Sequence, residues 1–146
     1  MATTQFDLDS CLLCMTARSS KLFAKKFNLA LQPFGLTKST WTAIYYIDKH
    51  EQINQKTLAE LLGIKGPSLV KIIAQLQLAQ LIKVTPSPVD KRERLLTLTP
   101  AGLTRLTDGL PLAEKFQQQV THGITQADLD IAATVMTQML ENAEQF

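Results

Sequence analysis

The order of elements predicted for residues 55–98 constrains the fold more than any other feature of this sequence. A short amphipathic helix ends at Gly63, a residue that readily adopts the left-handed conformation found at the ends of many helices. After a tight turn comes Pro67, which favours the first turn of the next helix. Two helices joined by a glycine turn, the second with a polar outer face, are typical of a helix-turn-helix.

A hairpin is predicted directly after the second helix. Residues 81–85 and 95–98 have the composition of strands, and residues 90–94 between them are all charged. We therefore predict a mainly α fold with a small β-hairpin wing, in which residues 37–99 form a winged helix-turn-helix.

The preceding part of the chain predicts two helices with apolar faces. We expect the first to run from Leu8 to about Leu31, with Asp7 or Asp9 as its N-cap. Thr37 is the expected cap of the second, and Ile53 is an extended link beyond it.

The C-terminal part also predicts helices. Thr99 followed by proline is a strong helix start, and we expect this helix to bend at residues 109–111 and to end near Gly123. Thr125 is the expected cap of a last helix with an apolar stripe.

The distribution of charge indicates a basic module. The 146 residues carry 15 Lys and Arg against 13 Asp and Glu, and this net charge of +2 identifies no partner. Residues 56–105 alone carry +5, whereas residues 106–146 carry −5. This asymmetry favours a basic module that binds a polyanion, the alternative being that a net +5 block arises by chance in a chain of this length.

Composition and motifs exclude several other classes of protein. A hydrophobic content of 45% excludes disorder, and no apolar run approaches the roughly 20 residues of a membrane-spanning helix. The polar N-terminus is unlike a signal peptide, so we expect a cytoplasmic protein. The sequence contains no catalytic triad, phosphate loop or cluster of metal ligands, so we expect neither an enzyme nor a cofactor or metal site.

The outer faces of the winged helix supply the candidate DNA contacts. Polar side chains opposite the apolar stripe of the second helix can meet base edges in the major groove, and basic side chains at the hairpin tip can displace counterions from phosphates. Each is an ordinary surface residue on its own, but their order within the basic module favours DNA binding. The candidates are Lys65, Ser68, Lys71 and Gln75 on the helix, and Asp90, Lys91, Arg92 and Arg94 on the hairpin.

Residues 58–64 read LAELLGI, and the sequence Asp90-Lys91-Arg92 is followed, after five residues, by LTPAG. These three stretches resemble the MarR family of bacterial winged-helix transcriptional regulators. The resemblance implies that Arg92 enters the minor groove and that Asp90 orients it. A buried or half-buried carboxylate that pairs in a bidentate manner would preset the direction of the arginine.

Two positions depart from the family pattern. Gly66 must cap the second helix of the motif where the family often has Ser before Pro, and Gln80 stands shortly before the first wing strand, where Gly is common. Base preference therefore does not carry over.

Residues 1–36 and 100–146 are the predicted helical dimerisation region. Their apolar stripes lie outside the winged helix, so a second copy of the chain would bury them, although they could instead complete a monomeric core. The resemblance implies a homodimer, acting as a repressor at a palindromic operator whose half-sites lie about one DNA turn, roughly 34 Å, apart.

Two features suggest regulation. Cys11 and Cys14 share one helix face near its start, and peroxide sensors of the resembled family use a cysteine in this region; burial as small hydrophobic residues is the alternative. The family also responds to small aromatic or lipophilic ligands. Arg18, Trp41 and Tyr45 could line such a pocket, although the aromatic residues are expected first in the core.

A protein-interaction module is the alternative function. A winged helix can present its basic face to an acidic protein partner instead of DNA, without sequence-specific DNA binding.

Overall fold

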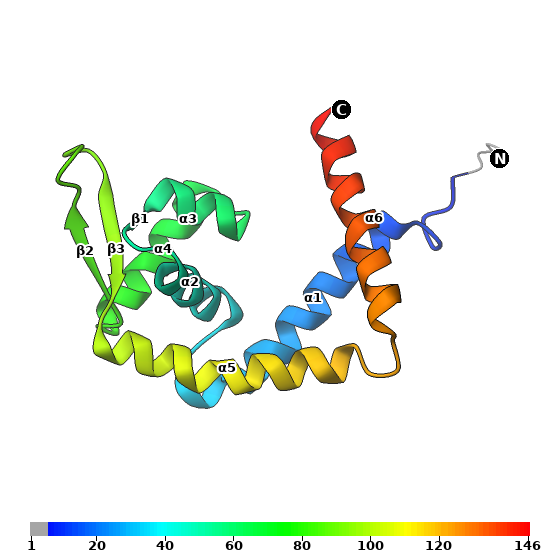
Figure 1. Cartoon of the computed structure of the whole chain (residues 1–146), viewed down its shortest axis with the longest axis horizontal. Helices are drawn as coiled ribbons and strands as arrows, with labels where there is room; N and C mark the ends of the chain where they lie inside the picture. The colour runs from blue at the N-terminus through cyan, green and yellow to red at the C-terminus, as the bar shows by residue number, and fades with distance from the viewer. Residues whose placement is uncertain (1–5) are drawn as a thin grey trace. The chain divides into compact units, whose positions relative to one another are not determined.

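The computed structural model describes residues 6–146 and divides the chain into two compact units, Met1–Ala113 and Glu114–Phe146. Residues 1–5, part of the predicted dimerisation region 1–36, lie outside the described residues. The fold is mainly helical with a small wing, as predicted (Figure 1). Its elements are α1 (Leu12–Leu31), the 3-10 helix η1 (Gln32–Phe34), α2 (Lys38–Lys49), β1 (Ile53–Asn54), α3 (Gln55–Leu62), α4 (Gly66–Leu78), β2 (Ile82–Pro86), β3 (Arg94–Leu98), α5 (Pro100–Val120) and α6 (Gln126–Glu144).

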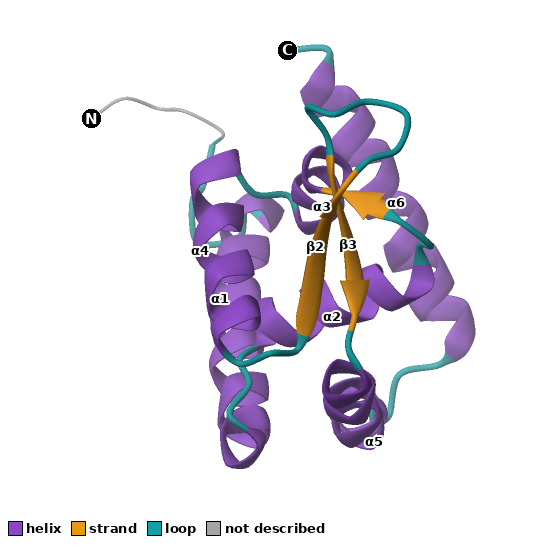
Figure 2. Cartoon of the chain, turned by 90° about the vertical axis from the view of Figure 1, so that its left-hand side faces the viewer, coloured by secondary structure: helices purple, strands orange, loops and turns teal. Residues whose placement is uncertain are grey.

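The wing is part of a three-stranded antiparallel sheet with the order β1-β3-β2. The predicted hairpin is formed by β2 and β3, which pair from Ile82–Leu98 to Pro86–Arg94 and lie side by side in Figure 2. The third strand was not predicted: β1 is only two residues long, and Ile53 pairs with Leu96.

The core of the larger unit brings the helix-turn-helix and the sheet together. Its six fully buried large side chains come from five different elements, so the helices and the wing base share one apolar interior. Each such burial contributes about 1.5–3 kcal/mol to folding. These side chains are Leu31, Ile44, Leu58, Leu69, Leu76 and Leu96.

Polar side chains fix the starts of the helices much as the sequence predicts. Thr37 and Thr40 form a capping box at the start of α2. The Asn54 side chain accepts the Thr57 N–H at 2.8 Å and so caps α3. The Thr125 hydroxyl accepts the Asp128 N–H at the start of α6.

The predicted start of the first helix was wrong by one turn. α1 begins at Leu12, with Cys11 at its N-cap position and no side-chain cap. The Asp7 carboxylate instead accepts hydrogen bonds from the Ser10 hydroxyl and the Asp9 N–H in the preceding turn. The bond from Ser10, followed by the one from Asp9, lowers the pKa of Asp7 from its ordinary value.

The predicted cap of the second motif helix was also wrong. Gly66 is the first residue of α4 and Lys65 is its N-cap, with no side-chain hydrogen bond. A lysine side chain has no acceptor for the free N–H groups of the first turn, so this helix starts without that stabilisation.

The LTPAG stretch joins α5 to the wing. The Thr99 N–H donates to the Leu81 carbonyl at 3.0 Å, and its hydroxyl donates to the Gln80 carbonyl at 2.7 Å. Gly102 lies so close to the Leu81 carbonyl that a Cβ there would overlap it. Glycine at this position therefore lets α5 begin directly against the end of α4 and the start of β2.

The C-terminal helices differ in detail from their predictions. α5 runs through Pro111 without interruption and ends at Val120, three residues before the predicted Gly123. The apolar stripe of α6 is not buried in its own unit. Within residues 6–146, no helix is long and apolar enough to cross a membrane.

Candidate nucleic-acid interface

The outer face of α4 carries the predicted polar residues. Leu69, Ile73 and Leu76 are buried, which fixes the orientation of the helix about its axis. Ser68, Lys71 and Gln75 fall on the other side at helical spacing and are exposed, and Lys65 is exposed at the N-cap. The four predicted helix residues are therefore available to a ligand that lies along α4.

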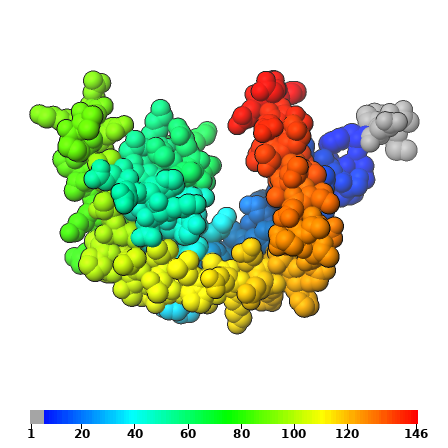
Figure 3. Space-filling model, viewed as in Figure 1, coloured from blue at the N-terminus to red at the C-terminus, as the bar shows by residue number. Residues whose placement is uncertain are grey.

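The hairpin tip exposes its basic side chains. The Arg92 side chain is 96% exposed and that of Asp90 is 52% exposed, and their closest N–O distance, from Nε to Oδ1, is 3.9 Å. The expected bidentate, half-buried pairing was therefore wrong. Asp90 also accepts the Arg92 backbone N–H at 3.0 Å, so it shapes the turn, while its ion pair with the guanidinium is long and exposed to solvent. Figure 3 shows the tip projecting from its unit.

Hydrogen bonds within the loop hold its backbone. The Ser87 N–H donates to the Glu93 carbonyl at 2.8 Å and closes the loop. The Ser87 hydroxyl, which is buried, accepts the N–H groups of Val89 and Asp90 at 3.2 and 3.3 Å. The tip therefore has a backbone fixed by hydrogen bonds, from which exposed basic side chains project.

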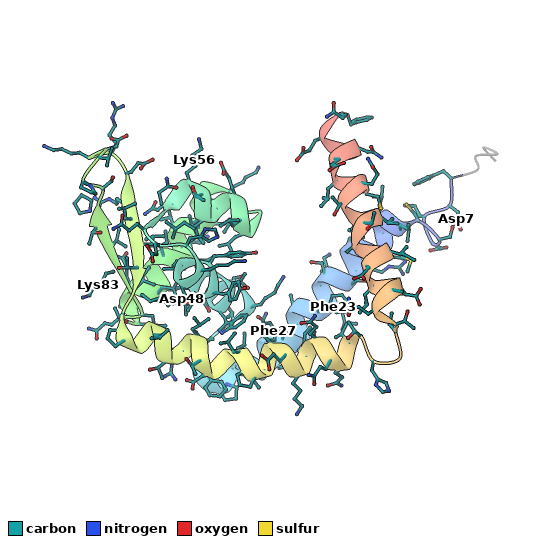
Figure 4. The ribbon with its side chains drawn as sticks, viewed as in Figure 1. Asp7, Phe23, Phe27, Asp48, Lys56 and Lys83 are labelled. Atoms are coloured by element: carbon teal, nitrogen blue, oxygen red, sulfur yellow. The ribbon has the colours of Figure 1, made fainter. Side chains whose placement is uncertain are left out.

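A groove of about 610 Å³ separates the hairpin from the helices. One wall is the start of α3 with Lys56, the floor includes Leu69 and Val70 of α4, and the other wall includes Arg92 and Arg94. Lys56 is exposed and points away from α3 (Figure 4), and sequence reasoning did not single it out. An exposed lysine on a helix is ordinary, and only the fold places this one across a groove from the wing.

The two cysteines lie at the start of α1. Cys11 is the N-cap residue and Cys14 belongs to the first turn, where its N–H donates to the Cys11 carbonyl at 3.0 Å. Both thiols are free and half-buried. The structure thus places them three residues apart at the start of α1 and leaves them partly accessible.

The predicted pocket residues are placed differently from one another. Trp41 is buried, packs edge to face on Phe27 at 5.6 Å and donates its indole N–H to the Leu106 carbonyl at 3.4 Å, so it serves the core. Tyr45 is half-buried beside it, with ring centroids 6.0 Å apart. Arg18 is exposed on α1.

The side chains of residues 6–146 form no group of three or more His, Cys, Asp or Glu that could hold a metal ion.

Comparison with known proteins identifies a family model and a relative that this chain resembles. The model of the MarR family matches residues 34–93, which include α2, α3, α4 and the hairpin loop. An uncharacterized HTH-type transcriptional regulator, YwoH of Bacillus subtilis, is 33% identical over 82 residues, a stretch that spans 56% of this chain and 59% of that protein.

Two solved structures in complex with DNA share the fold. MepR of S. aureus, bound to DNA, has a TM-score of 0.82 at 19% identity, covering 88% of this chain and 95% of that one. The repressor CouR, bound to a 23-mer DNA duplex, has a TM-score of 0.82 at 23% identity, covering 96% and 99%. CouR from Rhodococcus jostii has also been solved with p-coumaroyl-CoA.

Proposed function

We propose that this chain, whose residues 34–93 match the model of the MarR family, is a homodimeric repressor of transcription that binds a palindromic DNA operator. The observation that carries the proposal is the exposure, on one compact unit, of both the polar face of α4 and the basic tip of the wing. A helix of this size fits the major groove of B-DNA, and a hairpin beside it can reach the adjacent minor groove or backbone.

Charge supports DNA as the ligand of this surface. Lys71 lies on the exposed face of α4, Lys65 lies at its start, and Lys56, Arg92 and Arg94 line the groove beside it. Basic side chains that neutralise phosphates release condensed counterions, which drives binding. The DNA complexes of the structural relatives MepR and CouR support the same assignment.

Exposed apolar side chains support a homodimer. On α1, Leu12, Leu13 and Leu22 are exposed, and on α6, Ile131 and Leu140 are exposed. Surfaces of this kind on a soluble chain are typical of subunit contacts. A two-fold dimer presents two α4 helices, which explains why the operator is expected to be a palindrome with half-sites about 34 Å apart.

The test is binding to double-stranded DNA from upstream of the gene for this protein, measured by fluorescence anisotropy. We expect one dimer per palindrome, an affinity at least about 10³-fold above that for a scrambled duplex, and steep weakening as salt rises. Undetectable binding, or binding indifferent to salt, would contradict the proposal.

The proposal includes a signal, either a small ligand or oxidation of a thiol, that releases the protein from DNA. CouR binds p-coumaroyl-CoA, which supports a small aromatic or lipophilic effector for this chain as well. The half-buried thiol of Cys14 is the other candidate, since oxidation would change its size and polarity at the start of α1. Peroxide should then release DNA from the wild type but not from Cys14→Ser, and a wild-type complex indifferent to peroxide excludes the redox signal.

One observation favours a protein partner as a second candidate function. Val70 and Leu78 on α4 are 59% and 89% exposed, and an apolar helix face can dock a protein. On DNA, the same side chains can contact thymine methyl groups. Replacing thymine by uracil in a bound duplex removes only that methyl, so weaker binding to the uracil duplex supports the DNA assignment, whereas a chain that binds no duplex at all supports a protein partner.

A further inference from the structure

The side-chain amide of Asn54 accepts one hydrogen bond and donates another. Its Oδ1 accepts the Thr57 N–H at 2.8 Å and caps α3. Its Nδ2 donates to Glu93 Oε1 at 3.2 Å, across 39 positions of the sequence. One residue thus joins the first turn of the helix-turn-helix to the loop of the wing.

The hydrogen bond between Asn54 and Glu93 lies just beyond the last paired residues of the sheet. β1 pairs with β3 only at Ile53–Leu96 and Asn54–Leu95, and the pairing of β2 with β3 ends at Pro86–Arg94. Glu93 is the next residue of the loop, and its carbonyl accepts the N–H of Ser87. The hydrogen bond from Asn54 therefore attaches the helix-turn-helix to Glu93, one residue beyond the end of β3 pairing. Glu93 is also the residue whose carbonyl closes the loop.

Arg92 depends on this arrangement because it precedes Glu93 in the chain. The groove between α3 and the hairpin is lined by Asn54 on one side and by Arg92 and Glu93 on the other. Its width sets how far the wing-tip arginine lies from α4. A hairpin free to swing about its strand ends would leave that separation undefined.

We propose that Asn54 and Glu93 are positioning residues that hold the tip of the wing, and with it Arg92, at the separation from α4 that DNA binding requires. The inference rests on the proposed DNA binding and adds to it two residues that need not touch the DNA.

The negative charge of Glu93 makes the proposal testable. Glu93 is an exposed carboxylate among Lys56, Arg92 and Arg94, with Glu60 as the other acidic residue lining the groove. On charge alone, any neutral residue at position 93 should bind phosphate-rich DNA more tightly. Positioning makes a different prediction, because glutamine keeps an oxygen acceptor for Asn54 and alanine does not.

Three single variants separate these effects in binding to an operator duplex. Asn54→Ser keeps a neutral N-cap but cannot reach Glu93, and Glu93→Ala removes the acceptor. Each should weaken binding about two- to tenfold, as the loss of one hydrogen bond implies. Glu93→Gln should bind at least as tightly as the wild type. If Glu93→Ala strengthens binding as much as Glu93→Gln does, the proposal is wrong.

A double-mutant cycle with Arg92 distinguishes positioning from a role in stability alone, because a residue that only stabilises the fold would not change the effect of Arg92→Ala on DNA affinity. Arg92→Ala should cost less affinity in the Asn54→Ser background than in the wild type, because the arginine is already misplaced there. An equal loss in both backgrounds would overturn the proposal. Thermal unfolding of Asn54→Ser, expected to match the wild type within a few degrees, separates a loss of position from a loss of fold.

The free protein distinguishes failure of this inference from failure of the proposed function. Amide hydrogen exchange of Ser87 and Glu93, whose N–H groups bond within the loop, should be faster in Asn54→Ser than in the wild type. Unchanged exchange rates overturn the link itself. If these rates rise but no variant binds DNA, the link stands as a feature of the fold and only its role in DNA binding is lost.

Discussion

At the scale of single residues, the end of α4 explains why glycine is common at the position that Gln80 occupies. Gln80 has a left-handed backbone, with φ +56°. Its N–H donates to the Gln77 carbonyl, and the N–H of Leu81 donates to Leu76, each at 2.9 Å. The same hydrogen-bond pattern ends α3, where the left-handed residue is Gly63. Glycine suits this position because it has no Cβ to crowd the carbonyl oxygen.

We therefore expect Gln80→Gly to stabilise the protein. A left-handed L-residue costs about 1–2 kcal/mol, and the greater freedom of unfolded glycine offsets about 0.5–1 of this, which leaves a net gain of about 0.5–1 kcal/mol. Urea unfolding measures the change. Gln77→Gly, inside the helix, is the matched control and should be destabilising. A loss of stability for Gln80→Gly would show that this backbone is not strained.

Gly102 illustrates the opposite requirement, for space rather than for backbone freedom. We expect Gly102→Ala to lower the free energy of unfolding by about 1–3 kcal/mol, because its Cβ would overlap the Leu81 carbonyl. Gly66→Ala is the control, since nothing lies within 4 Å of a Cβ there. Equal, small effects of the two substitutions on the unfolding midpoint would contradict the close approach.

At the scale of elements, the start of α4 balances stability against charge. The helix begins at Lys65 without a side-chain cap, although residues with oxygen acceptors are the strong caps. A lysine at this place adds positive charge next to the exposed face of α4. The helix thus gives up a local hydrogen bond at the point where we propose that it meets phosphates.

Lys65→Ser should move two measurements in opposite directions. The new cap is expected to raise the free energy of unfolding by about 1 kcal/mol, and the lost charge to weaken DNA binding at any sequence. Unfolding in urea and anisotropy on operator and scrambled duplexes measure the two effects. A variant that is more stable and binds DNA unchanged would remove Lys65 from the interface.

Most elements of the fold could be predicted because local signals mark their ends. Gly63, Pro67 and Thr99 define boundaries that the structure confirms within a residue or two. β1 could not, because a two-residue strand shows no alternation and is formed only by its pairing with β3. The start of α1 was misplaced because an aspartate caps a turn as readily as a helix.

The candidate site was predictable in its residues but not in its arrangement. Helical spacing was enough to put Ser68, Lys71 and Gln75 on one exposed face. The groove that places Lys56 opposite Arg92, by contrast, depends on pairing between distant parts of the chain. No local pattern reports such a contact.

At the scale of the whole molecule, the net charge changes sign along the chain. Residues 56–105 carry a net charge of +5, and residues 106–146 carry −5. Exposed apolar side chains occur on α1 and on α6, outside the winged helix, and also on α4 within it. The near-neutral total of +2 is thus consistent with one surface for DNA and another for a second copy of the chain.

A charge placed on the apolar face of α6 should weaken the proposed dimer. Val135 is an exposed apolar residue of this helix, and Thr134 points to another side of it. Burying an unpaired aspartate costs several kcal/mol, so Val135→Asp should shift the dissociation midpoint to higher concentration, whereas Thr134→Asp should not. Light scattering coupled to gel filtration measures the mass, and a monomeric wild type would contradict the dimer directly.

The salt dependence of DNA binding tests the central claim most directly. Arg92→Ala and Lys115→Ala each remove one positive charge per chain, from the wing tip and from the acidic C-terminal segment respectively. In the plot of log affinity against log salt, we expect the slope to fall by about two for the Arg92→Ala dimer and to stay unchanged for Lys115→Ala. Equal slopes for both variants and the wild type would contradict the assignment of the wing to DNA.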